Sequence, residues 1–482
     1  MISEPFFYVL PLLVPAFTAV FVLLLDLFLP GEKKGLATGI AVLGLLITAI
    51  SCARLWTEDA LFLFHEAIRM DRFSIFFTLL AAGLTGLTIL NVYPLAAEKK
   101  VPAGELLFFL LSCCVGMSLM AWATDLITLF MSLEIMSLTV YILTGIQRER
   151  VTATEGAFKY FLLGAFSTGF LLYGIAFIYA SAGSTTFSDI ANFLVTSRYT
   201  IPTIFYIGVA LLLVGFAFKI ASVPFHMWVP DVYEAAHPAV TGLMATGIKA
   251  AAFGAFIRFF LVTLFSIKPE WNMVVWALSV ATMTVGNLAA LMQRNIKRML
   301  AYSSIAHAGY ILVAVAAAKS QIFNLGISAI LFYLIAYGLM TMGAFSVIVY
   351  ASQQEEKNQI DDYAGYGFSH PYLGLAMTLF MLSLTGIPLT AGFIGKFYVF
   401  SAALKSHLFI LALIAIANSI IAAFYYLRII MIFYMRKGEA GPIRRSPSLI
   451  AVLGLTSAGT VLLGIFPAWW LKIIQDSITA LF

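Results

Sequence analysis

The sequence predicts an all-α integral membrane protein of about fourteen transmembrane helices, and two observations carry that prediction. Hydrophobic residues make up 62% of the 482 residues and charged residues only 11%, which is far from the balance of a soluble domain. Apolar runs of about 20 residues recur along the whole chain, and that length crosses roughly 30 Å of hydrocarbon. Each run must be a helix, because a single helix satisfies all of its own backbone hydrogen bonds in lipid.

The apolar runs place the helix cores in chain order. The first run is expected to stay as a helix, because Glu4 stands where a signal peptide has basic residues and the run is too long for one. The seventh run contains Pro224 and the twelfth contains Pro388, so both helices should break. The predicted cores are 6–29, 36–54, 73–93, 105–123, 126–146, 156–181, 203–229, 239–264, 272–292, 300–318, 324–350, 371–404, 409–434 and 448–472.

The two broken runs also resemble each other. Ala221–Phe225 and Thr385–Leu389 both read as two small residues, a β-branched residue, proline and an apolar residue. Five spans separate them, so the second copy enters the membrane from the opposite side, as in transporters with inverted repeats. The predicted organisation is therefore a three-helix segment, two inverted five-helix repeats with one broken helix each, and a C-terminal helix, at 1–104, 105–265, 266–435 and 436–482.

Basic residues in the loops predict the orientation. If both termini lie outside, about fourteen lysines and arginines fall in inward loops and about eight in outward loops, which is the favoured bias. The net charge of +5 is therefore a topology signal and not a nucleic-acid signal. The inward set is Lys33, Lys34, Lys99, Lys100, Arg148, Arg150, Arg294, Lys297, Arg298, Lys357, Arg436, Lys437, Arg444 and Arg445.

Four charged residues stand well inside predicted spans: Glu134, Lys219, Lys249 and Lys396. A charge at the bilayer centre costs roughly 2.5–3.5 kcal/mol on insertion scales, so such residues are functional by default. Burial disfavours the charged lysine while a nearby carboxylate favours it, which suits proton transfer. The hypothesis is that Glu134 modulates Lys219, Lys249 passes the proton on and Lys396 delivers it. The structural alternative is that these charges only pair to fix helix packing.

Other polar residues in the spans support weaker predictions. Lys159 lies about one turn inside the sixth span, where snorkelling to the interface is as good an explanation as function. His226 and His307 are candidate relay residues or plain helix histidines. His237, before Pro238, is predicted to be structural, and Arg258 to be an interface anchor.

No cofactor or metal motif is recognisable. His65-Glu66 lacks the second histidine of a zinc protease, since Arg69 holds that position. Gly365-Tyr366-Gly367 lacks the third glycine of a dinucleotide loop. Cys52, Cys113 and Cys114 have neither disulfide-framework nor cluster-binding spacing, so we expect this chain to bind no cofactor.

Several stretches resemble subunit N of the respiratory NADH:quinone oxidoreductases, an antiporter-like membrane family, and the resemblance covers nearly the whole chain. One departure is Ala235-Ala236-His237-Pro238 after Asp231-Val232-Tyr233-Glu234, where the family usually has Gly-Ala-Pro. The stretches are Ser132–Leu138, Lys159–Phe166, Phe225–Tyr233, Asn295–His307 and Gly386–Phe397.

The resemblance implies a fourteen-helix proton-pumping module in the inner membrane, working beside other membrane-arm subunits. It places Glu134, Lys219, Lys249 and Lys396 on the translocation path. NADH, FMN, iron–sulfur clusters and quinone are expected in partner subunits. The alternatives are a subunit of a multi-subunit cation/proton antiporter or membrane-bound hydrogenase, a free-standing transporter, and a passive membrane scaffold.

Overall fold

The computed structural model describes residues 4–28, 34–97, 101–197, 200–318, 325–438, 441 and 443–481. Within these ranges the regular elements are helices and a single two-stranded antiparallel hairpin, β1 Leu61–Leu63 and β2 Ile68–Met70. Twelve of the described helices are long and apolar enough to cross a membrane. The predicted all-α membrane architecture is therefore confirmed.

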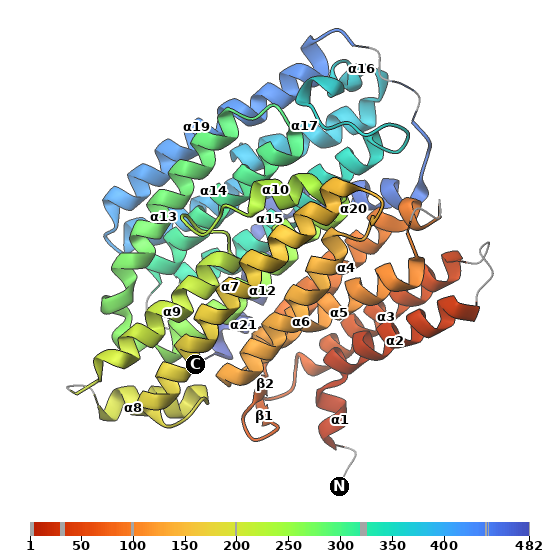
Figure 1. Cartoon of the computed structure of the whole chain (residues 1–482). Helices are drawn as coiled ribbons and strands as arrows, with labels where there is room; N and C mark the ends of the chain where they lie inside the picture. The colour runs from red at the N-terminus through yellow and green to blue at the C-terminus, as the bar shows by residue number, and fades with distance from the viewer. Residues whose placement is uncertain are drawn as a thin grey trace.

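The N-terminal part forms one edge of the bundle, drawn in red and orange in Figure 1. Three long helices follow a short first turn, and the outer faces of the first two carry many exposed apolar side chains. These elements are α1 Glu4–Tyr8, α2 Leu10–Phe28, α3 Lys34–Leu55 and α4 Arg72–Ala97.

The first half of the remaining bundle contains one broken helix and two turns of wider π-helix. Its elements are α5 Ala103–Trp122, α6 Leu126–Thr144, α7 Val151–Ala182, α8 Phe187–Thr196, α9 Thr203–Lys219, α10 Val229–Ala235, α11 Pro238–Leu243, η2 Met244–Ile248, α12 Lys249–Phe256 and η3 Ile257–Thr263.

The second half contains the other broken helix. Its elements are η4 Phe265–Ile267, α13 Lys268–Leu291, α14 Ile296–Ala317, α15 Leu325–Ala351, η5 Ile360–Tyr363, α16 Tyr366–Ser369, α17 Pro371–Thr385, α18 Ala391–Lys405 and α19 Phe409–Met435. The chain ends with α20 Pro447–Ile465 and α21 Pro467–Thr479.

The helices differ sharply in how much of each the protein itself covers. The spans Pro238–Thr263 and Ile296–Ala317 are each 94% buried, whereas Leu10–Phe28 is 28% buried. Three helical segments in the middle of the bundle (α11–η3, α14 and α15) therefore see almost no lipid. A charged group on them must be satisfied by protein or internal water.

Two ends of the bundle can be distinguished. We call the end formed by 56–71, 123–125 and 183–187 the hairpin face, since bridges join Ile68 to Ala123 and Asp125 to Thr186 there. The opposite end, formed by 147–150, 231–237, 294–298 and 352–362, we call the basic face. Helix α1 lies at the hairpin face in Figure 1, and Arg69 reaches the carbonyl of Ala480 there at 2.9 Å.

Some local structure differs from the prediction. The hairpin and the amphipathic helix α8 fall between predicted spans, because short polar segments carry no membrane-length signal. The predicted last span, 448–472, is interrupted at Phe466, where Pro467 starts a new helix.

Candidate functional site

Both predicted helix breaks are present, and both fall in the predicted proline segments. The first break covers 220–228, between α9 and α10, and Ala221 has a positive φ of 62°. The second covers 386–390, between α17 and α18, where Gly386 takes φ 94° and ends α17. A proline removes a backbone donor, and a residue in the left-handed region ends the helix before it. Each break leaves carbonyl groups at the end of a half-helix deep in the bundle.

Lys219 is the last residue of α9 and is 2% exposed. Its Nζ donates to Ser137 Oγ at 2.7 Å and to Tyr141 Oη at 3.3 Å, both on α6. Glu134, which is predicted to modulate Lys219, makes no direct ion pair with it, so the alternative of an ion pair that only fixes helix packing is not what the structure shows. Glu134 is half-buried one turn from Ser137, and its Oε1 accepts from Thr168 of α7 at 2.8 Å.

Lys249 begins α12, directly after the π-helical turn η2, and is 2% exposed. Its Nζ donates to both the backbone oxygen (2.6 Å) and the hydroxyl of Ser304 on α14. Short π-helical turns inside α-helices occur often at functional sites, so η2 marks Lys249 as a candidate site residue.

His307 lies one turn beyond Ser304 on the same face of α14. Its Nδ1 meets the hydroxyl of Tyr333 at 2.8 Å and its Nε2 meets that of Tyr426 at 2.9 Å. The imidazole is therefore held between α15 and α19. Both ring nitrogens have hydroxyl partners that can either give or take a proton.

Lys396 of α18 is 4% exposed and turns back to the preceding half-helix. Its Nζ donates to the backbone oxygen of Thr385, the last residue of α17, and to Ser419 Oγ, each at 2.8 Å. The same Nζ lies 5.2 Å from the centre of the Tyr310 ring. A cation at a helix C-terminus is favoured by the helix dipole.

Helix α14 joins the last three groups. Ser304, His307 and Tyr310 stand at successive three-residue intervals, so they form one stripe along the helix. Ser304 holds Lys249, and Tyr310 faces Lys396. The structure therefore brings Lys249, His307 and Lys396 together along one helix face.

The remaining predicted site residues lie apart from that stripe. His226 is inside the first break, 9% exposed, and its Nδ1 makes no hydrogen bond to any described residue. Lys159 is about half exposed near the basic face, paired with Glu155 at 2.8 Å and Asp231 at 3.4 Å. That position fits a surface ion pair between α7 and α10.

The prediction that Arg258 is an interface anchor is wrong. Its side chain is 3% exposed and its Nη2 pairs with Asp71 at 2.8 Å, while its Nε donates to the carbonyl of Ala121. Asp71 also pairs with Arg69 at 3.3 Å. This buried cluster ties the hairpin to η3, and no helical spacing could have revealed it because Asp71 is far away in the chain.

Sequence reasoning missed the neutral partners of the charges. Ser137, Thr168, Ser304 and Ser419 each hold a charged side chain at this site. Serine and threonine are common in membrane helices, where they also bond to their own backbone, so their presence alone carries no signal. Only spatial proximity to the lysines distinguishes these four.

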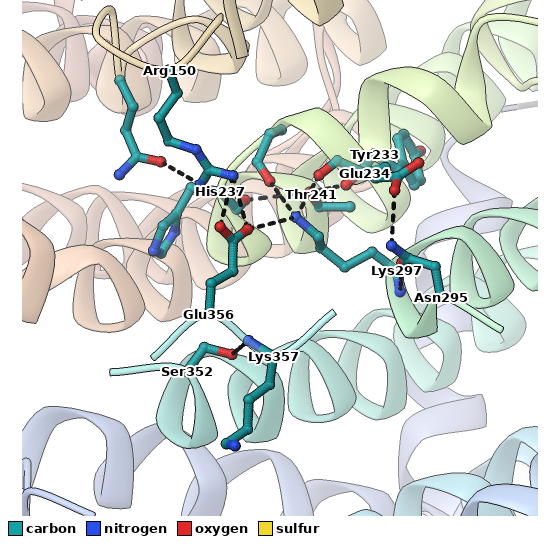
Figure 2. Close-up of polar contacts among 12 residues, drawn as sticks. Arg150, Tyr233, Glu234, His237, Thr241, Asn295, Lys297, Ser352, Glu356 and Lys357 are labelled. Carbon is teal, nitrogen blue, oxygen red and sulfur yellow. Dashed lines mark hydrogen bonds and ion pairs between the residues drawn. The ribbon is translucent and has the colours of Figure 1, made fainter. Parts of the chain in front are cut away.

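A second polar network occupies the basic face (Figure 2). Glu356 points toward both Arg150, at 2.8 Å, and Lys297, at 3.7 Å. Burial raises the pKa of the Glu356 carboxyl, but the hydrogen bond from Arg150 and the charge of Lys297 outweigh it, so the pKa lies below its usual value. This network joins the loop after α6 to the loop after α15.

The same electrostatic pattern recurs at Asp231. Its carboxylate pairs with Arg298 at 2.8 Å, and Arg298 also pairs with Glu234 at 2.8 Å. Burial again opposes ionisation, but the hydrogen bond from Arg298 and the charge of Lys159 lower the pKa of Asp231. Ion pairs therefore connect several segments at the basic face, and Asn295 of α14 also donates a hydrogen bond to Glu234.

Buried amines beside two broken helices, in a bundle of membrane-length helices, define an antiporter-like membrane subunit. Residues 123–422 match the family model described as "NADH:quinone oxidoreductase/Mrp antiporter, TM". Within that class, the chain belongs to the family of NADH-quinone oxidoreductase subunit N. The resemblance seen in the sequence is confirmed.

Individual relatives agree with this assignment. The chain is 43% identical to a NADH-quinone oxidoreductase subunit N from Trichlorobacter lovleyi, over 95% of this chain and 93% of that protein. It is 32% identical to a chain of the respiratory complex I from Thermus thermophilus, with a TM-score of 0.81 over 96% of this chain and 98% of that one. A chain of the archaeal membrane-bound sulfane sulfur reductase is 23% identical, with a TM-score of 0.88 over 98% of this chain and 97% of that one, and shares the fold.

Proposed function

We propose that Glu134, Lys219, Lys249, His307 and Lys396 form the path along which this chain moves protons. The proposal rests on one observation: the amines of three almost fully buried lysines donate hydrogen bonds to serine and tyrosine hydroxyls and to backbone carbonyls. Among the described residues, none of the three forms an ion pair. A buried ammonium without a counter-ion is held only weakly in its charged form, so a nearby change of charge can release its proton.

The chain is a membrane subunit of a proton-translocating NADH:quinone oxidoreductase, and its partners are other membrane-arm subunits. It contributes proton movement to a translocase whose electron transfer takes place elsewhere. We place NADH, FMN, the iron–sulfur clusters and quinone in those partner subunits. A pump of this kind needs charged groups that change protonation without leaving the protein interior, and the lysines meet that need.

Each lysine has a distinct part in the proposed path. Glu134, held by Thr168, sets the charge near Lys219. Lys249 passes the proton along the α14 stripe to His307, whose two hydroxyl partners can relay it. Lys396, at the end of α17, delivers it. His226 lies in the first break beside this path, and Lys159 contributes to the charge of the basic face.

The finer architecture belongs to the same proposal. We assign fourteen membrane passes by counting each broken helix (α9 with α10, α17 with α18) as one. The two breaks are then equivalent positions of two inverted five-helix repeats, 105–265 and 266–435, flanked by the segments 1–104 and 436–482. The hairpin face, with both termini, is assigned to the outer side, because the predicted inward residues Arg150, Lys297 and Arg298 lie at the basic face.

The proposal is tested by replacing Lys249 with alanine. In membranes carrying Lys249→Ala, proton translocation per NADH oxidised should collapse, because the central acceptor of the path is lost. Lys437→Ala, which removes an exposed lysine beyond α19, is the matched control and should pump normally. Unchanged pumping at unchanged assembly would make Lys249 a structural residue and refute the path.

A further inference from the structure

Two buried asparagines of the second half lie on helices that carry none of the proposed path residues. Asn287 of α13 is fully buried, and Asn418 of α19 almost fully. Asn287 Nδ2 donates to Asn418 Oδ1 at 3.2 Å. Asn418 Nδ2 in turn donates to Thr284 of α13 at 3.3 Å and to the carbonyl of Ile414 at 3.0 Å. A buried amide is costly unless it is hydrogen-bonded, so these contacts fix both side chains.

Asn287 also holds two tyrosine hydroxyls. Its Nδ2 donates to Tyr310 Oη of α14 at 3.2 Å, and its Oδ1 accepts from Tyr425 Oη of α19 at 2.9 Å. Both tyrosines are buried, and Tyr425 lies two turns along α19 from Asn418. One side chain of α13 therefore contacts α14 and α19 at the same time. An amide suits this position, since it carries donors and an acceptor but no charge.

The close packing of α13 on α14 fixes the position of this amide. A Cβ on Gly286 would lie 2.6 Å from the backbone nitrogen of Ala306 of α14. Ser279 of α13 also donates to the carbonyl of Gly309 of α14 at 2.9 Å. Small residues allow two membrane helices to approach this closely, and polar contacts then hold them together. The amide of Asn287, next to Gly286, therefore has little freedom to move relative to α14.

Tyr310 is the first point at which this network meets the proposed proton path. The Nζ of Lys396 lies 5.2 Å from the centre of the Tyr310 ring, and Asn287 holds the hydroxyl of that same ring. An ammonium group within about 6 Å of a ring centre is attracted to the face of the ring, and more strongly where water is excluded. The attraction depends on the orientation of the ring, which the bond to Asn287 fixes.

The network reaches Lys396 a second time through α19. Ser419, which accepts from Lys396 Nζ at 2.8 Å, directly follows Asn418 in the chain. The bond between Asn287 and Asn418 restricts the rotation of α19, and with it the place of the Ser419 hydroxyl. Two contacts of Lys396, the Tyr310 ring and Ser419, therefore depend on Asn287, whereas its bond to the end of α17 does not.

We propose that Asn287 is a positioning residue that sets how firmly Lys396 holds its proton. It keeps the face of the Tyr310 ring and the hydroxyl of Ser419 against the amine, and both contacts favour the charged form. The amide itself neither takes up nor gives up the proton. This inference rests on the proposed function of Lys396, but it adds control from α13, a helix that the row of charges does not include.

The groups around Lys396 make the pH dependence of pumping a suitable measurement. Helices α14, α15, α17, α19 and α20 pack against α18. Helix α20 contains no titratable side chain, and the one on α17, Tyr372, lies about 20 Å along the helix from Thr385. The titratable side chains that the other three helices bring to this region are His307, Tyr310, Tyr333, Tyr337, Tyr425 and Tyr426.

A histidine ordinarily loses its proton near pH 6.5 and a tyrosine near pH 10. Because burial favours the neutral amine, Lys396 is the group of this region that we expect to change charge between those limits. A shift of the pH dependence between pH 7 and pH 10 therefore reports on how firmly Lys396 holds its proton.

The test measures proton translocation against pH in membranes carrying Asn287→Leu, at matched subunit content. Leucine has a similar volume but no amide, so the Tyr310 ring loses its anchor and the amine gives up its proton at a lower pH. The pH at which pumping falls to half on the alkaline side should move down by about half to one and a half units, as expected for a weakened cation–ring contact. An unchanged midpoint would refute the proposal.

Tyr310→Phe provides a second arm, which remains decisive if Asn287→Leu does not assemble. It removes only the hydroxyl that Asn287 holds and keeps the ring, so the midpoint should move in the same direction. Adding Tyr310→Phe to Asn287→Leu should shift it no further, because both changes break the same contact. No shift in Tyr310→Phe alone, or a further shift in the double variant, would contradict the proposal.

Ser279→Ala is the matched control for a loss of packing between α13 and α14. It removes the bond to Gly309 and leaves the amide network in place, so the midpoint should not move. An equal shift in this variant would mean that the midpoint reports helix packing, and the role of Asn287 would fall. Lys396→Met tests the proposed function separately. If it abolished pumping while Asn287→Leu kept the normal midpoint, the path would stand and the control from α13 would not.

Discussion

The two broken helices each carry a buried lysine, and the two lysines obtain their hydrogen-bond acceptors in different ways. At the first break, Lys219 ends its own half-helix and reaches sideways to another helix, α6, where Ser137 and Tyr141 receive it. At the second break, Lys396 stands on the later half-helix and turns back to the carbonyl that ends the earlier one. The first amine is held by a neighbouring helix, whereas the second is held partly by the break itself and partly by Ser419 of α19.

Because their contacts differ, the two lysines should respond to different movements of the protein. A shift of α6 or α7 changes the contacts of Lys219 and the position of Glu134 together, since Thr168 of α7 holds that carboxylate. The hydrogen bond from Lys396 to the carbonyl of Thr385 changes when α17 and α18 move relative to each other, while its other hydrogen bond goes to Ser419 of α19. We therefore expect proton binding at Lys219 to respond to the charge of Glu134, and proton binding at Lys396 to respond to the geometry of the backbone at the second break.

The largest expected effect is at Gly392, just after the second break. A Cβ at this position would lie 1.8 Å from the backbone oxygen of Ser383, so α18 could not keep its approach to α17. Gly392→Ala should cost about 3 kcal/mol or more and reduce the assembled subunit in membranes, measured by immunoblot of the intact complex. Gly454→Ala, where a Cβ meets open space, should assemble normally.

Removing either lysine should have the next largest effect. Lys219→Met and Lys396→Met keep the length of the side chain but remove the proton-binding amine, and each should lower the pumping rate by about 10²-fold or more. The measurement is proton uptake by vesicles during NADH oxidation, at matched subunit content. A variant that pumped at the normal rate would exclude that break from the path and leave the other as the functional one.

The hydroxyl partners should show the asymmetry between the breaks directly. Ser137→Ala removes the shorter of two hydroxyl contacts of Lys219, whereas Ser419→Ala leaves Lys396 bonded to Thr385. A hydrogen bond to a charged group is worth about 1.5–3 kcal/mol, so Ser137→Ala should lower the pumping rate several-fold and Ser419→Ala less. Ser118→Ala, buried and bonded to its own helix, serves as the control. Equal losses at the two breaks would contradict the distinction.

The sequence did not predict these hydroxyl partners of the lysines. The all-α membrane architecture, the two breaks and the four charges inside apolar runs could be predicted, because a proline or a lysine in an apolar run is conspicuous. The α14 stripe could not, since α14 is buried on nearly every side and its hydrophobic pattern does not point to one face. The pairing of Arg258 with Asp71 depends on folding that brings residues 187 positions apart into contact, and nothing local indicates it.

The relation between Glu134 and Lys219, where a helix-fixing ion pair was the structural alternative to modulation, illustrates the same limit. Lys219 is buried and Glu134 is half-buried, but a hydroxyl of α6 stands at the amine and a hydroxyl of α7 stands at the carboxylate. Opposite charges in one region of a sequence predict an electrostatic influence. Helix rotation decides which atoms lie between the two charged groups. A small rotation replaces an ion pair by two hydrogen bonds, one from each charged group to a hydroxyl.

Thr168 offers a finer test of control at the first break. Thr168→Val removes the donor that holds Glu134 and preserves the volume of the side chain, so it should change pumping about two- to threefold without changing assembly, as expected for a single hydrogen bond worth about 0.5–1.5 kcal/mol. Pumping and NADH oxidation are measured together in the same membranes. The effect should vanish when Glu134 is already glutamine, and additive losses in the double variant would show that Thr168 acts elsewhere.

The smallest effect is expected at the basic face, where Arg150 of the first half meets Glu356 of the second. The pKa of Glu356 is lowered in the folded chain, so the stabilisation from its charge is complete above its unfolded pKa, about 4.3, and is lost as the pH falls through the lower folded value. Because the carboxylate is 44% exposed, solvent screening limits the contribution to about 1 kcal/mol or less. Glu356→Gln should therefore lower the Tm of the purified complex slightly at pH 7, and the difference from the wild type should shrink below about pH 4. A difference that stayed constant across that range would mean that packing of this side chain, and not its charge, joins the two halves.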